Sequence, residues 1–378
     1  MATPYHRLAR EHPDHEWWKL PVAGLIGTMG YVIVSSVLGV GLVVVLLVTA
    51  RDDPGTFDRW LDELVAGTTS SPWVLAVMLA SIALLLPAVL LSVLATGPRP
   101  VGYLSSVQGR LRWGWLARVT AVAFALYGAV IVGSLALGLG GDVTGPSLDD
   151  QALLYVLIAL LLVPFQATAE EYVFRGYLFQ LVGSWTRFAI IPVLVSTPLF
   201  VAGHLYEFWG LVDVTIFALM ASYLVIRTGG LEAAIAAHVA NNLVLFTLEG
   251  FNVLLVTTEE YGPVDVLPTL LTSVVFVLLV ELMARAEGLQ RTRAPLPPKP
   301  PPPPPMWGPP WPYPYLPQPY GYPVQPYGYP VQPYGHPAQP YGYPPQAPYP
   351  YPHPPQDPFG AAPALPPVPP PPPGATHD

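Results

Sequence analysis

The chain has 378 residues, of which 52% are hydrophobic and 11% are charged, and its net charge is −8. Soluble domains carry about 25% charged residues, so this composition argues against an ordinary soluble enzyme and favours a membrane protein. The acidic balance argues against nucleic acid as a partner. Cysteine is absent, which excludes disulfide frameworks, thiol nucleophiles and cysteine-bound metal centres.

Apolar stretches long enough to cross a membrane recur along the first 290 residues. A spanning helix needs about 20 mostly apolar residues, because the hydrocarbon core is about 30 Å thick. The polar face that a buried helix of a soluble protein would show at helical spacing is missing. We therefore predict an all-α fold, a polytopic transmembrane helix bundle of about eight spans, at residues 22–49, 73–96, 114–138, 151–183, 188–205, 208–226, 231–248 and 266–284.

The loops between these stretches differ in charge. Twelve Lys and Arg residues lie at the N-terminus, in loop 97–113, at Arg187 and Arg227, and after the last span, whereas the alternate loops hold only Arg51 and Arg59. Loops rich in Lys and Arg stay in the cytoplasm. The sequence therefore predicts a multi-pass protein of the cytoplasmic membrane with both termini in the cytoplasm.

The C-terminal part of the chain has a different composition, since 37 of the 51 prolines lie in residues 295–378. A degenerate heptad of the type PYGYPVQ repeats over 319–346. Proline at this density favours extended polyproline II and cannot build a helix or a sheet. We expect a disordered tail that is either a plain spacer, a ligand for proline-recognition grooves of the SH3 or WW type, or a self-associating segment.

Ionisable and amide side chains interrupt three of the predicted spans. A charge near the centre of a membrane helix costs roughly 2.5–3.5 kcal/mol, so such residues are candidates for function. The fourth span contains Glu170, Glu171 and Arg175, the fifth ends at His204, and the seventh contains His238, Asn241 and Asn242.

The spacing of these residues allows them to meet at one level. Glu170 lies 17 residues before Arg187, in the turn between spans four and five, and His204 lies 17 residues after it. On antiparallel helices both are roughly 25 Å from that turn. A helix over 151–183 would be about 50 Å long, so we expect a kink at Pro164 or an end that extends beyond the lipid.

The two adjacent acids have different expected environments. Glu171 and Arg175 have the i, i+4 spacing of a helical ion pair, whereas Glu170 points about 100° away. One paired and one free carboxylate suit a general base. In the alternative interpretation both acids form a structural ion cluster with Arg175.

Three short motifs carry a resemblance to a known family. They read Glu170-Glu171-x-x-x-Arg175, Phe200-x-x-x-His204 and His238-x-x-x-Asn242. In this order and on separate helices they resemble the motifs of the intramembrane CAAX-protease and bacteriocin-processing family, of the prenyl-protein endopeptidase type. The resemblance covers roughly residues 150–250.

The resemblance implies hydrolysis of a peptide bond in a membrane cavity that opens to the cytoplasm. Glu170 and His204 would hold and deprotonate the attacking water, His238 and Asn242 would stabilise the oxyanion, and Glu171 with Arg175 would brace the site. The family also implies a divalent metal, zinc by preference, with Glu170, His204, His238 and Asn242 as candidate ligands. Two imidazoles, a carboxylate and an amide could equally act on water directly. The implied partners are a peptide or membrane-protein substrate, prenylated or not, and membrane lipid.

Two other functions remain open from the sequence. One is a non-proteolytic membrane scaffold or immunity-type binding protein that uses the tail as a docking arm, and the other is an ion or solute carrier. Some polar residues are expected to be structural: His6, His12 and His15 as solvated surface and Glu232 at a helix N-terminus. Glu281, in the last span, has no partner that the sequence identifies.

The predicted organisation has five parts. They are a cytoplasmic N-terminal segment (1–20), spans one to three (21–149), a catalytic core of spans four to seven (150–250), an external loop with the last span (251–290) and the cytoplasmic tail (291–378).

Overall fold

The computed structural model describes residues 2–12, 15–49, 51, 55, 57–59, 61–62, 71–97, 100–138, 148–253 and 262–294. The chain divides into two units, Met1–Pro301 and Pro302–Asp378, and every described residue belongs to the first. The Pro-rich tail that the sequence predicts from residue 295 lies outside the described residues.

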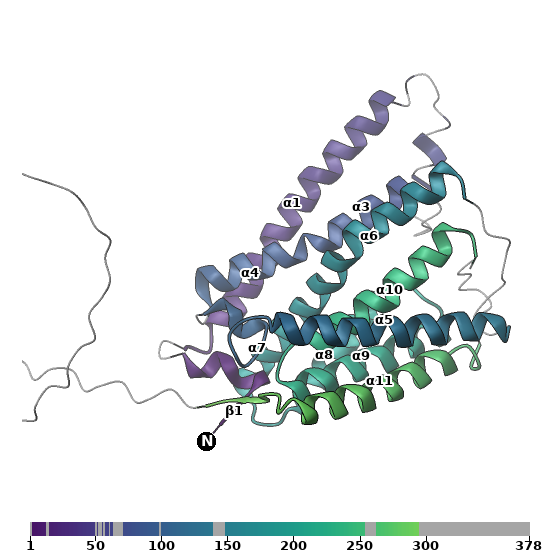
Figure 1. Ribbon diagram of the computed structural model, residues 1–378. Coiled ribbons are helices and arrows are strands. Elements are labelled where there is room, and N and C mark those ends of the chain that lie inside the picture. The colour runs from purple at the N-terminus through teal and green to yellow at the C-terminus, as the bar shows by residue number, and fades with distance from the viewer. Residues whose placement is uncertain are drawn as a thin grey trace, which may run out of the picture. The chain divides into compact units, whose positions relative to one another are not determined.

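Helices occupy all eight predicted stretches, so the all-α prediction is confirmed (Figure 1). Among the described residues, six helical runs are long and apolar enough to cross a membrane. The helices are α1 (Lys19–Thr49), α3 (Pro72–Ala83), α4 (Leu85–Thr96), α5 (Trp113–Ala136), α6 (Asp150–Glu171), α7 (Leu178–Trp185), α8 (Ile190–Ala202), α9 (Phe208–Thr228), α10 (Glu232–Gly250) and α11 (Leu267–Ala286).

Two of the predicted spans differ from the other six. Helix α8 has only 13 residues, and α10 is not among the six apolar runs because it carries several polar side chains. Helix α10 packs against α5, α6 and α9 (Figure 1), and every residue from Glu232 to Ala240 is buried. Five alanines in that stretch allow close helix approach. Neighbouring helices rather than lipid therefore surround the first half of α10.

Proline and a π-helical turn shape the long helical runs. Helix α3 ends at Ala83, four residues before Pro87, whose ring clashes with that carbonyl and interrupts the helix. The run from α6 to α7 departs from α-helical bonding at Tyr172–Tyr177, a π-helical turn, rather than at Pro164, which lies inside α6. This run of 36 residues is the long helix that the sequence predicts.

The N-terminal segment is packed into the body, which corrects the expectation that His6 is solvated surface; His12 and His15 are partly exposed. Residues Tyr5–Glu11 form a 3₁₀ helix in which His6 is only 3% exposed. Gly183 of α7 leaves room for the His6 backbone, because a Cβ there would overlap the His6 carbonyl. The Tyr5 hydroxyl donates to the Leu104 carbonyl.

The start of the predicted tail is also part of the body. Strand β1 (Thr3–Pro4) pairs antiparallel with β2 (Thr292–Arg293), so residues 292 and 293 pack on the N-terminal segment, and the predicted domain boundaries stay a prediction. Arg293 lies 3.1 Å from a Glu11 carboxylate oxygen and stacks over the Tyr103 ring at 4.8 Å. The segment after α11 therefore joins the N-terminal segment to the loop before α5.

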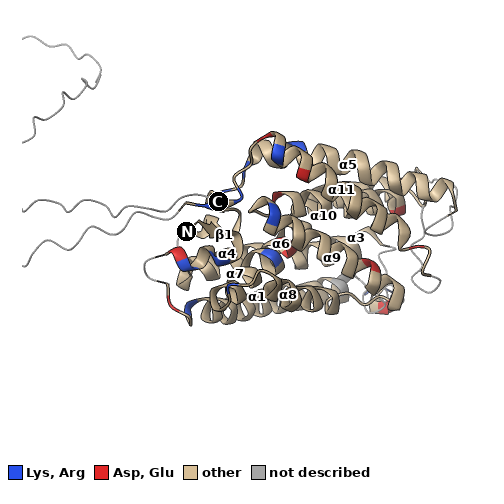
Figure 2. Cartoon of the chain, turned by 90° about the horizontal axis from the view of Figure 1, so that it is seen from below, with Lys and Arg blue, Asp and Glu red and all other residues tan. Residues whose placement is uncertain are grey.

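Two further acids, Glu232 and Glu281, have ion-pair partners near the end of the body that carries β1 and β2. Glu232 accepts from the Arg112 backbone and from its Nε and Nη2, at 2.6–2.9 Å. Glu281 forms an ion pair with Arg227 at 2.5 Å and with Arg291 at 3.3 Å. Figure 2 shows most Lys and Arg at the end of the body that carries β1. This distribution matches the predicted charge asymmetry between the two sides of the bundle. The cytoplasmic location of both termini stays a prediction.

Candidate functional site

The site begins at the junction of α6 and the π-helical turn. Glu171 is the last residue of α6 and Arg175 lies within the turn, and both side chains are fully buried. Arg175 Nη1 donates to Glu171 Oε1 at 3.0 Å, which is the ion pair that the i, i+4 spacing predicts. The Arg175 guanidinium also lies over the ring of Phe200, 4.1 Å from its centroid. A π-helical turn often marks a functional site, and here it positions the only cation of this cluster.

His238 of α10 lies between the two adjacent acids. Its Nδ1 is 2.8 Å from Glu171 Oε1 and its Nε2 is 3.6 Å from Glu170 Oε2. Because a carboxylate only accepts, Nδ1 carries the hydrogen of the short contact, and Nε2 faces Glu170. The imidazole is 4% exposed and packs edge-on against Phe217 at 5.0 Å. Arg175, Glu171, His238 and Glu170 thus form a chain of contacts between α10 and the junction of α6 with the π-helical turn, in which Glu170 alone is partly exposed.

A row of amides reaches Glu170 from the other side. Gln166, one turn earlier on α6, donates from Nε2 to Glu170 Oε1 at 3.0 Å. Its Oε1 accepts from Asn242 Nδ2 at 3.2 Å, and Asn242 Oδ1 accepts from Asn241 Nδ2 at 3.1 Å. Glu170 Oε2 is buried and accepts no hydrogen bond from the described residues.

His204 follows the end of α8 and belongs to the edge of this cluster. Its Nδ1 is 2.9 Å from the Phe200 carbonyl, so Nδ1 carries the hydrogen and Nε2 keeps its lone pair. The Phe200 ring lies 4.8 Å from the ring of His204 and 6.1 Å from that of His238. The two imidazoles therefore share one aromatic neighbour, and no hydrogen bond among the described residues joins His204 to the other site residues.

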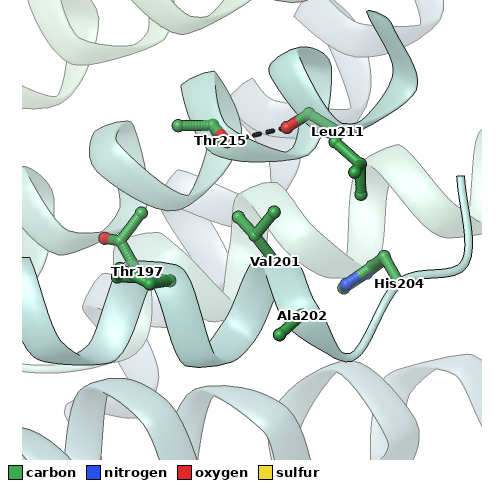
Figure 3. Close-up of a pocket in the computed structure, with 7 residues that line it drawn as sticks. Thr197, Val201, Ala202, His204, Leu211 and Thr215 are labelled. Carbon is green, nitrogen blue, oxygen red and sulfur yellow. Dashed lines mark hydrogen bonds between the residues drawn. The ribbon is translucent and has the colours of Figure 1, made fainter. Parts of the chain in front are cut away.

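A pocket adjoins His204 between α8 and α9, with a volume of about 550 Å³. Its wall is mostly apolar and comprises Thr197, Pro198, Val201, Ala202, His204, Leu211 and Thr215. Figure 3 shows the His204 side chain turned back toward Ala202 and Val201, with Leu211 and Thr215 on the facing helix. The pocket could hold an apolar group beside the imidazole.

The donor geometry bears on the metal that the resemblance implies. Among the described residues no three His, Asp or Glu side chains form a group that could hold a metal ion. His238 Nδ1 and His204 Nδ1 are engaged by Glu171 and by the Phe200 carbonyl. Because Nε2 of each imidazole keeps its lone pair, the metal that the resemblance implies stays a prediction, and no chemical step below is derived through it.

The structure unites most of the predicted site residues. Glu170, Glu171, Arg175 and His238 are linked directly, Asn242 joins them through Gln166, and His204 lies beside them across Phe200. Gln166 is not among the site residues that the sequence motifs predict. The signal that could have found it is an amide four residues before Glu170 in an otherwise apolar run.

The apolar helices, with acids and imidazoles gathered between them, define a multi-pass membrane protein with a buried polar site. Residues 151–244 match the model of the family described as type II CAAX prenyl endopeptidase Rce1-like. This region contains all six predicted site residues and Gln166.

A curated relative shares the same region. The uncharacterized protein YyaK of Bacillus subtilis (strain 168) is 35% identical over 94 residues, which is 23% of this chain and 31% of that protein. The match thus spans about a third of the relative's length. No solved structure matches the chain.

Proposed function

We propose that this protein is an intramembrane endopeptidase of the CAAX type, which hydrolyses a peptide bond with water activated by Glu170 and His204. The observation that carries the proposal is the buried carboxylate oxygen Glu170 Oε2, which faces His238 Nε2 at 3.6 Å within the family-matched region. A buried carboxylate oxygen that accepts no hydrogen bond is costly to maintain, and such atoms occur at sites of proton transfer.

Glu170 is suited to take a proton from the attacking water. One of its oxygens is fixed by Gln166, which leaves Oε2 as the oxygen that can act as base. His204 keeps its Nε2 lone pair and can accept the second hydrogen of the same water. The water oxygen then forms a bond to the carbonyl carbon of the substrate, and its proton moves to Glu170 Oε2.

The cleavage step returns that proton. The carbon–nitrogen bond breaks, the electron pair stays with the amine nitrogen, and Glu170 passes its proton to the same nitrogen. Asn242 donates only one of its two Nδ2 hydrogens to Gln166, so the second can stabilise the oxyanion. Donors of this kind contribute about 10²–10³-fold in kcat.

Glu171 and Arg175 hold His238 in place. Glu171 Oε1 receives both the Arg175 Nη1 hydrogen and the His238 Nδ1 hydrogen, which fixes the imidazole so that Nε2 faces Glu170. A carboxylate that orients a histidine in this way also stabilises its protonated form during proton transfer. The pair thus supports the reaction without touching the substrate.

The test compares peptide termini in cell membranes that contain the wild type or Glu170→Gln. This isosteric change removes the base and preserves side-chain volume. Glu287→Gln is the matched control, because Glu287 forms an exposed pair with Arg118 outside the site. We expect a set of new peptide termini with the wild type and the control, and its loss with Glu170→Gln and His204→Ala at equal membrane levels.

Identical termini in all four membranes would contradict the proposal and favour a non-proteolytic scaffold, whose function should instead depend on residues 295–378. Metal analysis of the purified wild type, with activity measured before and after a chelator, decides whether a divalent ion also takes part. If the chelator abolishes activity and zinc restores it, the site contains a metal. Glu170, His204, His238 and Asn242 are then the first candidate ligands to substitute.

A further inference from the structure

A group of three arginines surrounds Glu281 where α9 and α11 end. Arg227 lies in the last turn of α9, Arg285 in the last turn of α11, and Arg291 in the segment between α11 and β2. Their guanidinium nitrogens lie 2.5, 3.6 and 3.3 Å from the carboxylate oxygens of Glu281, in that order. We call Arg227, Arg285 and Arg291 the arginine cluster.

The arginine cluster carries more positive charge than Glu281 neutralises. Among the residues that the structure describes, Glu281 is the only acid in an ion pair with these arginines, so three cations share one anion. Each guanidinium has five N–H donors, whereas a carboxylate has only two oxygens. Arg227 donates from two nitrogens and Arg291 from one, and Arg285 Nε lies too far away for a hydrogen bond. Most donors of the cluster are therefore available to a second anion.

The backbone around Arg291 fixes the position of this third arginine. Gly229, which ends α9 in the left-handed conformation, packs on it so closely that a Cβ there would lie 2.5 Å from the Arg291 carbonyl oxygen. The next two residues of the chain form β2, and the preceding carbonyl, that of Gln290, accepts from Arg112. An anion at the cluster thus meets donors from two helix ends and a fixed segment, which lowers the entropy cost of binding.

Apolar side chains lead to the arginine cluster along the outer faces of α9 and α11. On α11, Leu278 and Leu282 are 58% and 62% exposed and lie on the same helical face as Arg285. On α9, Leu219 and Tyr223 are also exposed, and they precede the arginine of that helix by eight and four residues. Both faces end at arginines that contact the same carboxylate, so the two apolar stripes converge at the cluster.

We propose that the arginine cluster binds the headgroup phosphate of an anionic phospholipid, whose acyl chains lie along the apolar stripes of α9 and α11. A guanidinium can donate to two phosphate oxygens at once. Basic pockets between membrane helices bind anionic headgroups on the cytoplasmic side, which is where the loop charges predict this end of the body. The surplus charge selects an anion, and the stripes select a lipid over a soluble phosphate. The proposal does not depend on the proposed hydrolysis.

The experiment measures binding of two phospholipids with the same acyl chains to the purified full-length protein by native mass spectrometry. Phosphatidylglycerol has a net negative charge, whereas phosphatidylcholine carries the same phosphate and is neutral overall. The test variant combines Arg285→Gln with Arg291→Gln and leaves Arg227 in place. The matched control combines Arg118→Gln with Arg187→Gln, because both are exposed arginines outside the cluster.

We expect the wild type and the control variant to bind phosphatidylglycerol about tenfold more tightly than phosphatidylcholine. The test variant should lose most of this preference, because each arginine near an anionic headgroup contributes about fivefold in Kd. Equal losses in the test and control variants would show that any surface charge suffices. Equal binding of the two lipids by the wild type would show that no anion site exists. Either result would overturn the proposal.

A second pair of variants removes an acid instead. The phosphate and the Glu281 carboxylate compete for the same donors, so Glu281→Gln should tighten phosphatidylglycerol binding by about fivefold. The glutamine keeps an oxygen that can accept from Arg227. Glu287→Gln removes an equal charge just after α11 and should leave the Kd unchanged, because Glu287 pairs with Arg118 outside the cluster. Unchanged or weaker binding in a folded Glu281→Gln variant would also overturn the proposal.

A last comparison separates a lipid from a soluble anion with the same phosphate chemistry. The titration of the wild type is repeated in millimolar inorganic phosphate and, separately, in glycerol phosphate, which has no acyl chains. Phosphatidylglycerol should stay bound in both, since only the lipid also contacts the apolar stripes. Full displacement of the lipid by either anion would assign the arginine cluster to a soluble phosphate compound and refute the lipid site.

Discussion

The protein contains two buried Arg–Glu pairs that differ in how many of their polar atoms form hydrogen bonds. Arg112 and Glu232, at the end of the bundle where α10 begins, are fully paired: Arg112 binds both carboxylate oxygens and two backbone carbonyls, those of Thr228 and Gln290. Arg175 and Glu171, at the candidate site, share one hydrogen bond.

The second pair leaves polar atoms without partners. Arg175 Nε and Nη2 and Glu171 Oε2 are buried and form no hydrogen bond with the described residues. Buried polar atoms are nearly always hydrogen-bonded, and a group that is not fully hydrogen-bonded calls for an explanation such as a catalytic role. The difference in hydrogen bonding therefore distinguishes Glu232 from Glu171, the acid that we propose acts at the site, although the sequence shows both as charges inside apolar helices.

The largest expected effect on stability comes from breaking the structural pair. Glu232→Ala leaves Arg112 buried without its carboxylate, and loss of one partner of such a pair costs about 3–5 kcal/mol. We expect little folded protein at 37 °C, measured by size-exclusion chromatography of the detergent-solubilised protein after heating. An unchanged unfolding temperature would mean that this pair does not hold the start of α10.

The two pairs should also respond differently when both partners become apolar. Replacement of a buried pair by apolar residues of similar volume is often neutral or stabilising. We expect Glu171→Leu with Arg175→Met to unfold within about 1 kcal/mol of the wild type, and to generate no new peptide termini. The matched variant, Glu232→Leu with Arg112→Met, should be clearly less stable, because the Thr228 and Gln290 carbonyls also lose their donor. Equal stability of the two double variants would contradict the claim that the Arg112–Glu232 pair contributes more to stability than the Arg175–Glu171 pair.

Part of this arrangement could be predicted from the sequence, and the reason is local spacing. Apolar runs located the eight helical stretches, and the i, i+4 spacing predicted the pair of Glu171 with Arg175. The burial of His6 could not be predicted, because it depends on Gly183 and on a two-residue strand near residue 292. The contact of Gln166 with Asn242 could not be predicted for a similar reason, since the two residues lie 76 positions apart.

The buried N-terminal segment gives a prediction of pH dependence. Burial lowers the pKa of His6 relative to its ordinary value. The unfolded chain therefore binds a proton at a higher pH than the folded protein, and stability is lost as the pH falls below about 6.5. We expect the unfolding temperature to decrease between about pH 7 and pH 5 and His6→Phe to weaken that decrease. An equal decrease of the unfolding temperature in the wild type and in His6→Phe would show that a group other than His6 causes it.

The smallest effect is expected at the exposed pair of Arg118 with Glu287. Its side chains lie 2.6 Å apart and face solvent, where such pairs contribute little. Glu287→Gln should leave both the unfolding temperature and the peptide termini unchanged, and high salt should act equally on it and on the wild type. A loss of activity in this variant would show that a charge just after α11, outside the site, also matters, and would weaken the contrast with Glu170.

The central claim is that Glu170 directs water to a peptide carbonyl inside the bundle. The most direct measurement incubates membranes in ¹⁸O-labelled water and follows the new carboxyl termini by mass spectrometry. The account predicts one ¹⁸O atom in each terminus formed by the wild type and by Glu287→Gln, and no such termini with Glu170→Gln. Labelled termini that form equally with Glu170→Gln would contradict it.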